Sequence, residues 1–139
     1  MTTSLVDVCQ RVDADLTTAG LSGRYALFSL QTQSFVYGVS SEGDVPTDFG
    51  DHGYVLVAFG TQLLLDDKDD VEQMAVELSS ALQDLVIDQL GTGWPERIAA
   101  EGLTGILTPA MVNRQACWTV RGQPVAALGE LPSTLGTAA

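Results

Sequence analysis

The segment from Asp66 to Gly91 constrains the fold of this chain more than any other part of the sequence. Its acidic start suits the positive end of a helix dipole, and Asp69 can cap the helix with Glu72 in capping-box position. Gly91 is a natural helix stop. Apolar residues recur between these signals at spacings of three and four, which predicts a long helix with one broad buried stripe. That stripe consists of Val71, Met74, Ala75, Leu78, Leu82, Leu85 and Val86.

A second amphipathic helix is predicted from Ser4 to Ala19. Ser4 can cap this helix, Asp7 lies in capping-box position, and Gly20 follows as a stop. Cys9 falls within the apolar stripe and is therefore expected to pack in the core. The stripe consists of Leu5, Val8, Cys9, Val12 and Leu16.

The sequence between the two helices predicts strands. Successive residues of Arg24–Leu30 fall alternately on the two faces of a predicted strand. Ser34–Val39 is rich in β-branched and aromatic residues. Gly53–Phe59 is almost continuously apolar, which favours a central strand buried on both faces. Thr61–Leu65 either extends that strand or forms a short fourth one. The polar segment Ser40–His52, with its Gly, Pro and Asp residues, is expected to be an exposed loop.

The last third of the chain also predicts strands, at Leu103–Thr108 and Met111–Val120. The turn signal Arg121-Gly122-Gln123 is followed by Pro124–Leu128, an expected edge strand because Pro124 cannot donate to a ladder. The element order is thus α-β-β-β-α-β-β(-β). It predicts an α+β fold in which two main helices pack on a mostly antiparallel sheet. We expect a single domain over residues 1–131 and a disordered tail over 132–139.

Charge limits the classes of partner. The chain has 139 residues and a net charge of −12, from 18 acidic and 6 basic residues. Such a surface repels nucleic-acid phosphates and anionic membranes, so we expect neither partner, whereas basic partners are attracted. The N-terminal residues do not resemble a signal peptide, and the longest strongly apolar run, Tyr54–Phe59, is too short to span a bilayer. These features favour the cytoplasm.

Several short patterns resemble chemical sites, but each has a structural explanation. Asp44, Asp48, Asp51 and His52 offer calcium-type ligands and a general base, yet their spacing matches no EF-hand and no nucleophile is evident. Gly91-Thr92-Gly93 follows a helix instead of preceding one, which favours a helix exit over a phosphate loop. We predict no catalytic residue, no cofactor and no metal ligand.

The two cysteines also have a structural explanation. Cys9 and Cys117 form no Cys-x-x-Cys pair, and in a reducing compartment both are expected to be free thiols. Arg114 and Arg121 flank Cys117 in sequence, but a buried strand cysteine is favoured over a reactive one.

The helix before Gly91 carries a second line of residues opposite its core stripe. Val76 and Ile87 are eleven residues apart and therefore share one line, next to Ser80 and Gln83. This line has three alternative explanations: isolated surface residues, a homodimer face, or a contact with the chain's own C-terminal segment. Two later tryptophans can anchor a partner or close the core. The candidate interface residues are Val76, Ser80, Gln83, Ile87, Trp94 and Trp118.

The segment Leu85–Leu131 resembles the C-terminal part of a family of uncharacterised actinobacterial proteins. That family has Trp-Pro, a Cys-Pro-x-His cluster, Trp-x-Cys-Pro and a closing Val-Ala-x-Ile-Gly-Glu-Leu. The matching residues here are Trp94-Pro95, Trp118 and Val125-Ala126-Ala127-Leu128-Gly129-Glu130-Leu131. The positions of the family's Cys, His and second Cys hold Arg97, Ala100 and Val120. The resemblance implies a member that keeps the β-scaffold without a zinc site.

In element order and acidity the chain is also similar to type III secretion chaperones and their fold relatives. Those proteins are homodimers that bind extended segments of a partner protein, which implies an interface role for Val76 and Ile87. The favoured function is therefore a non-enzymatic protein-interaction module, in the form of a chaperone-like homodimer. One alternative is a small-molecule binding or catalytic domain with a site near the 40–52 loop, and another is a structural remnant of a zinc-ribbon protein.

Overall fold

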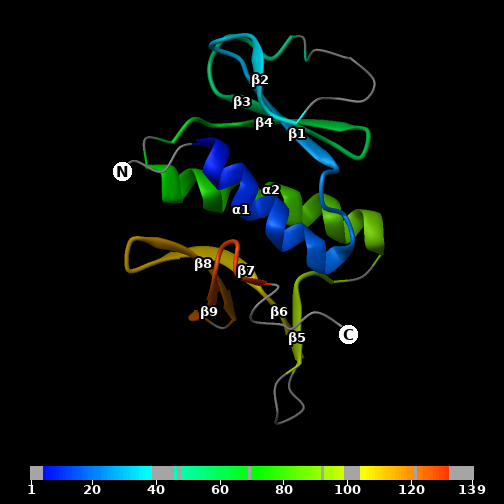
Figure 1. Ribbon diagram of the computed structural model, residues 1–139, viewed down its shortest axis with the longest axis vertical. Helices are drawn as coiled ribbons and strands as arrows, with labels where there is room; N and C mark the ends of the chain where they lie inside the picture. The colour runs from blue at the N-terminus through cyan, green and yellow to red at the C-terminus, as the bar shows by residue number, and fades with distance from the viewer. Residues whose placement is uncertain are drawn as a thin grey trace.

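The computed structural model describes residues 5–38, 46, 48–68, 70–91, 93–98, 104–120 and 122–131. Two helices form a middle layer between an N-terminal sheet and a C-terminal sheet (Figure 1). Helix α1 spans Leu5–Leu16 and continues into a 3-10 turn, Thr17–Ala19, while α2 spans Val71–Leu90. The predicted stop at Gly20 is confirmed, since this residue adopts the left-handed conformation at φ 71°.

The N-terminal sheet has four antiparallel strands in the order β2-β1-β3-β4. Their bounds are β1 Tyr25–Ser29, β2 Ser34–Tyr37, β3 Tyr54–Ala58 and β4 Thr61–Leu65. The predicted central place of Gly53–Phe59 is confirmed, because β3 lies between β1 and β4. Thr61–Leu65 forms its own strand, which is the second of the two predicted alternatives. Part of the predicted loop, residues 40–45 and 47, lies outside the described residues.

The C-terminal strands form a three-stranded sheet in the order β7-β8-β9, next to a short β5-β6 pair. Their bounds are β5 Glu96–Ile98, β6 Thr104–Ile106, β7 Thr108–Val112, β8 Gln115–Val120 and β9 Gln123–Ala127. The prediction of one strand over Met111–Val120 is wrong. Asn113 and Arg114 have φ values of 50° and 66° and form a tight turn, so the segment becomes a hairpin. The edge position of the strand containing Pro124 is confirmed.

The N-cap of helix α2 is Asp70, one residue after the predicted cap Asp69. The side chain of Asp70 accepts a hydrogen bond from the Glu72 backbone N–H at 2.9 Å. Asp69 and the predicted cap of the first helix, Ser4, lie outside the described residues. The predicted stop is confirmed, since Gly91 has φ 72° and its N–H donates to the Ile87 carbonyl at 2.9 Å.

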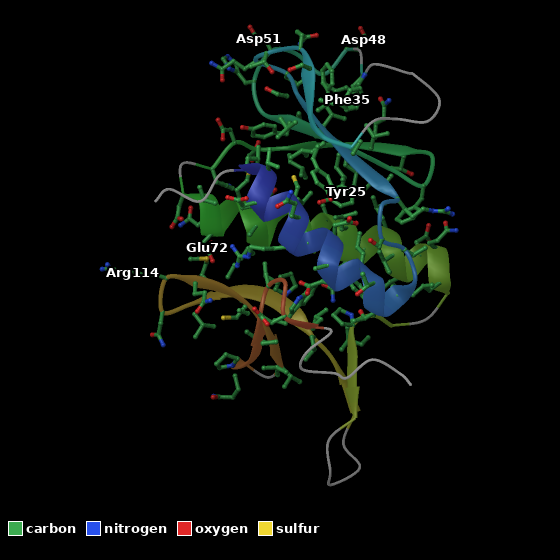
Figure 2. All side chains as sticks on the ribbon, in the orientation of Figure 1. Tyr25, Phe35, Asp48, Asp51, Glu72 and Arg114 are labelled. Carbon is green, nitrogen blue, oxygen red and sulfur yellow. The ribbon has the colours of Figure 1, made fainter. Side chains whose placement is uncertain are left out.

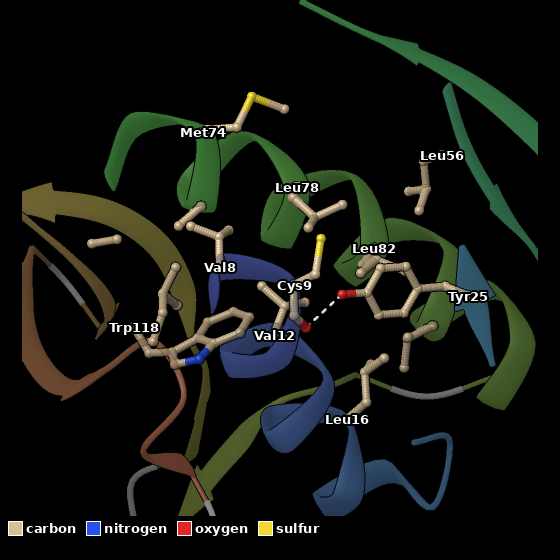
Figure 3. Close-up of a cluster of buried hydrophobic side chains, with 14 of the residues drawn as sticks. Val8, Cys9, Val12, Leu16, Tyr25, Leu56, Met74, Leu78, Leu82 and Trp118 are labelled. Carbon is tan, nitrogen blue, oxygen red and sulfur yellow. Dashed lines mark hydrogen bonds between the residues drawn. The ribbon is translucent and has the colours of Figure 1, made fainter. Parts of the chain in front are cut away.

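Both sheets share one buried core with the helices (Figure 3). Helix α2 contacts β3 and β4 on one side and β7 and β8 on the other. The α+β class and the antiparallel pairing are confirmed, but the strands divide between two sides of the helix layer. Partly buried residues on α2 widen its apolar face enough to meet both sheets. They include Val76, Ala81, Leu85 and Ile87. In the described part of the chain, neither helix combines the length and apolar composition needed to cross a bilayer.

Truncation of Leu78 tests the position of the core. Leu78 is completely buried, so Leu78→Ala is expected to lower the free energy of unfolding by about 2–5 kcal/mol. The measurement is chemical denaturation followed by circular dichroism. Leu90→Ala makes the same change at the end of the same helix, where the side chain is 40% exposed, and should cost far less. Equal losses for the two variants would contradict this placement of the core.

Candidate functional site

Three of the six candidate interface residues lie on the outer line of α2. Ser80 is exposed, whereas Val76 and Ile87 are half-buried and pack against the main core. Their apolar surface is therefore already partly covered within one chain. The core of the same chain covers much of the side-chain area of Val76 and Ile87.

The other three candidate residues lie in the interior. The Gln83 side-chain amide donates to the carbonyl oxygens of Trp94 and Leu107, which links α2 to the start of the C-terminal region. Trp94 and Trp118 are 6% and 1% exposed, and their rings meet edge to face at 5.6 Å. In this chain the two tryptophans close the core, which is the structural alternative to a groove or anchor.

Asp15 holds the C-terminal segment against α1. Its carboxylate is fully buried and accepts hydrogen bonds from the Trp118 Nε1 at 2.8 Å, the Gly129 N–H at 2.7 Å and the Leu131 N–H at 3.0 Å. Burial raises the pKa of Asp15, and these three donors oppose that rise. The carboxylate thus accepts three hydrogen bonds from its own chain and has a structural role.

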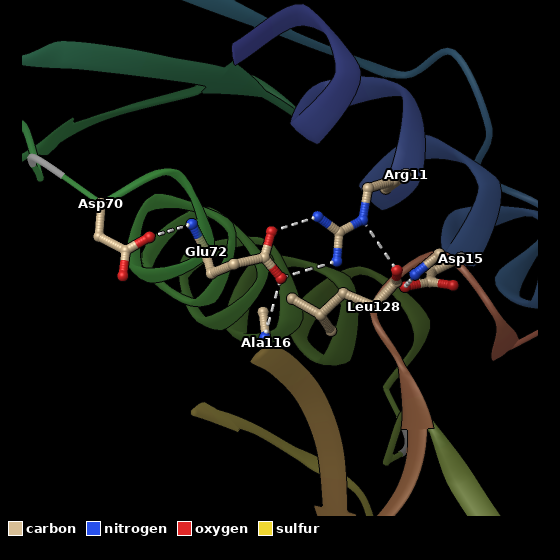
Figure 4. Close-up of polar contacts among 7 residues, drawn as sticks. Arg11, Asp15, Asp70, Glu72, Ala116 and Leu128 are labelled. Atoms are coloured by element: carbon tan, nitrogen blue, oxygen red, sulfur yellow. Dashed lines mark hydrogen bonds and ion pairs between the residues drawn. The ribbon is translucent and has the colours of Figure 1, made fainter. Parts of the chain in front are cut away.

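A second polar cluster joins both helices to the C-terminal sheet (Figure 4). The Arg11 guanidinium pairs with both oxygens of Glu72, at 2.7 and 3.2 Å, and its Nε donates to the Leu128 carbonyl at 3.0 Å. Glu72 also accepts from the Ala116 N–H at 3.0 Å. The hydrogen bonds from Arg11 lower the pKa of Glu72, against the opposing effect of burial. Glu72 therefore bonds across the layers, while Asp69, its partner in the predicted capping box, lies outside the described residues.

The described candidate ligands of the acidic loop, Asp48, Asp51 and His52, do not converge on one point as metal ligands would. The side chains of His52 and Asp51 are 95% and 85% exposed and lie 3.4 Å apart. Asp48 is also exposed, and Asp44 lies outside the described residues. A general base needs a partner held within reach, and an imidazole surrounded by water has none fixed. Among the residues that the structure describes, no three His, Cys, Asp or Glu side chains converge as metal ligands would.

The cysteines are buried and separate. Cys9 and Cys117 are free thiols, and the expected burial of both is confirmed. Burial raises the pKa of the Cys9 thiol to about 12 and raises that of Cys117 as well. Both side chains are thus held in the protonated form, which is a poor nucleophile. Arg97, Ala100 and Val120 stand where the family that the chain resembles has zinc ligands. Arg97 lies in β5 and Val120 ends β8, whereas Ala100 is outside the described residues.

The sheet edges differ in how they are protected against pairing with another chain. In β2, the pairing with β1 shifts register and inserts Val36 as a bulge. The edge strands β7 and β9 contain Pro109 and Pro124, which cannot donate to an added strand. Over its whole length, Thr61–Leu65, β4 has neither proline, nor charge, nor register shift. Proteins normally block exposed edges with these devices, so β4 is the exception among the four edges of the two larger sheets.

The backbone of β4 is arranged to receive another strand. Phe59 and Gly60 form the tight turn between β3 and β4, with φ values of 52° and 76°. Hydrogen-bonded and non-bonded pairs alternate along an antiparallel ladder, starting from the bonded pair that closes such a turn. By this alternation Gln62 and Leu64 direct their backbone N–H and C=O groups away from β3. In the described residues no strand pairs with that side of β4.

An apolar row on the outer face of the N-terminal sheet leads to this edge. Phe35, Phe28, Val55 and Leu64 are register partners on successive strands. Figure 2 shows Phe35 on the side of the sheet away from the helices. Phe28 and Val55 are buried in a small cluster with Phe49, whereas Leu64 is 51% exposed. The row therefore ends in an uncovered leucine at the unprotected edge.

Comparison with known proteins finds no family model that matches the chain, no similar curated protein and no similar solved structure. The candidate functional site is the β4 edge, defined as the outward backbone of Thr61–Leu65 together with the exposed side chain of Leu64. The sequence prediction missed this site, although two prolines in the other edge strands were a visible signal.

Replacement of Asp15 tests its structural role. Asp15→Asn keeps the shape but turns an amide NH₂ toward one of three N–H donors, so at least one buried hydrogen bond is lost. The expected cost is about 1–3 kcal/mol in the free energy of unfolding, measured by chemical denaturation. Asp84→Asn, at an exposed position of α2, is the matched control and should have little effect. Similar stabilities for the two variants would show that Asp15 does not hold the C-terminal segment.

The ion pair of Glu72 predicts a pH dependence. Because the folded-state pKa of Glu72 lies below its ordinary value of 4.5, the pair stabilises the fold above that pH. This contribution is lost as the pH falls through the lower folded-state value. The difference in unfolding free energy between the wild type and Glu72→Gln should therefore shrink between about pH 7 and about pH 3. Arg11→Gln should behave in the same way, and a difference that grows on acidification would contradict the pairing.

Proposed function

We propose that this chain is a non-enzymatic protein-interaction module that binds a partner protein through the β4 edge. The observation that carries the proposal is the contrast between the edges of the two larger sheets. Three are blocked by a bulge or a proline, and β4 is left open beside an exposed Leu64. Addition of a strand to an exposed edge is a common mode of peptide recognition.

The state of the reactive side chains supports a role in binding instead of catalysis. The buried carboxylate of Asp15 is engaged by three donors of its own chain, and the thiol of Cys9 is held protonated. His52 is surrounded by solvent. The alternative of a small-molecule or catalytic site near the 40–52 loop requires a pocket holding His52 with a carboxylate and a hydroxyl. An imidazole that is 95% exposed gives that alternative no support.

The proposal includes a chaperone-like homodimer formed through the outer line of α2. Ser80 is exposed there, with half-buried Val76 and Ile87 on either side along the helix. Pairing of two α2 helices along this line leaves both β4 edges free for partner segments. The supporting surface is modest, since much of Val76 and Ile87 is already covered within one chain.

Site-specific crosslinking in the native host tests the proposed function. A photoreactive amino acid in place of Leu64 is expected to capture a partner protein, whereas the same group in place of Val6 is not. Val6 is a suitable control because it is an apolar residue of α1 with 40% exposure, against 51% for Leu64. The captured chain is then identified by mass spectrometry and purified.

Reconstitution completes this test. The purified partner should bind the wild type and Val6→Ser equally, and bind Leu64→Ser about tenfold more weakly, because an interface leucine contributes through apolar burial. Equal capture at both crosslinking positions, or equal binding by both serine variants, would overturn the proposed function. Light scattering of the purified wild type measures the homodimer separately.

A further inference from the structure

We propose that the β4 edge binds an extended, basic segment of another protein as a fifth strand of the N-terminal sheet. The inference names the partner class for the proposed function and rests on it. Backbone pairing would come from Gln62 and Leu64, whose outward N–H and C=O groups lie on the open side of β4. The five residues of Thr61–Leu65 offer about 17 Å of edge, enough to pair with a short peptide.

The apolar part of the recognition comes from Leu64. Its register partner Val55 is fully buried, and Leu64 extends the same row to the edge with half of its surface uncovered. A residue of the added strand that lies opposite Leu64 continues this row on the outer face. A β-branched or aliphatic side chain fits there, because it covers the leucine and favours the extended conformation.

The basic part of the recognition follows from the charges at the end of β4. The strand runs directly into Asp66 and Asp67, which are both exposed. Gly53 lies against the Leu65 backbone, and Tyr54 is the register partner of Leu65 at the same end. The negative charge of Asp67 acts on this end of the sheet, since it adds to the effect of burial in raising the pKa of Tyr54.

The charge of the whole chain has the same sign. With a net charge of −12 and only 6 basic residues, the chain attracts a cationic segment and repels an acidic one at long range. Lysine or arginine on the bound segment, placed beyond the residue opposite Leu65, would lie beside Asp66 and Asp67. The same charge disfavours a second copy of this chain at β4, because two acidic molecules repel each other.

Binding of labelled synthetic peptides to the purified full chain tests this inference. The probe alternates valine and threonine and ends in a run of lysine and arginine, and binding is followed by fluorescence anisotropy. One comparison peptide has glutamate in place of every basic residue. Another is N-methylated at alternate backbone positions, which removes the donors that strand addition needs.

The basic peptide should bind, and its affinity should fall as salt is added. The acidic and N-methylated peptides should each bind at least about tenfold more weakly. On the protein, Gln62→Pro should weaken binding because it removes an N–H of the open side. Joint replacement Asp66→Asn and Asp67→Asn should reduce both affinity and salt dependence. Asp84→Asn is the control, since it removes one exposed carboxylate from α2.

Each other outcome has a distinct meaning. Equal binding of the basic and acidic peptides would overturn the charge preference, and equal binding of the N-methylated peptide would overturn strand addition. Absence of peptide binding, with specific crosslinking retained at Leu64, would overturn the partner class and leave the proposed function standing. A crosslinked product at Leu64 that contains two copies of this chain would show self-pairing at β4 and overturn the inference.

Discussion

The buried carboxylate of Asp15 is the contact on which the C-terminal half of the molecule depends. A charged group without solvent is costly, and here it is tolerated because one indole and two backbone N–H groups all point at it. These donors come from residues more than a hundred positions later in the chain. The same carboxylate therefore fixes the tilt of Trp118 and the course of the chain after β9. Arg11, one helical turn earlier, extends the attachment to α2 through Glu72.

The three-layer arrangement explains how polar side chains of the helices connect the two sheets. Both helices lie between sheets, and Arg11, Glu72 and Gln83 on them bond across the layers. Gln83 shows this well, because its amide satisfies two backbone carbonyls in the interior. Among the edges of the two larger sheets, β4 is the least protected.

Local signals in the sequence predicted most of the secondary structure. The helix stops at Gly20 and Gly91, the central strand and the edge strand with Pro124 depend on nearby residues only. The hairpin turn at Asn113 and Arg114 was missed because neither residue is glycine, although both have positive φ. β5 was missed because its three residues carry too short a pattern. The role of Gln83 and the order of the strands depend on long-range contacts, so the site at β4 could not be read from periodicity alone.

The unprotected edge of β4 has a consequence for how the molecule behaves when it is concentrated. An open strand with an exposed leucine can join another of its kind, and the devices that usually prevent this are absent from Thr61–Leu65. The large negative charge opposes this edge-to-edge pairing. High salt or acidification weakens that opposition while leaving the edge unchanged. Solubility in this protein is thus an electrostatic property of the whole surface that compensates for a local weakness in one strand.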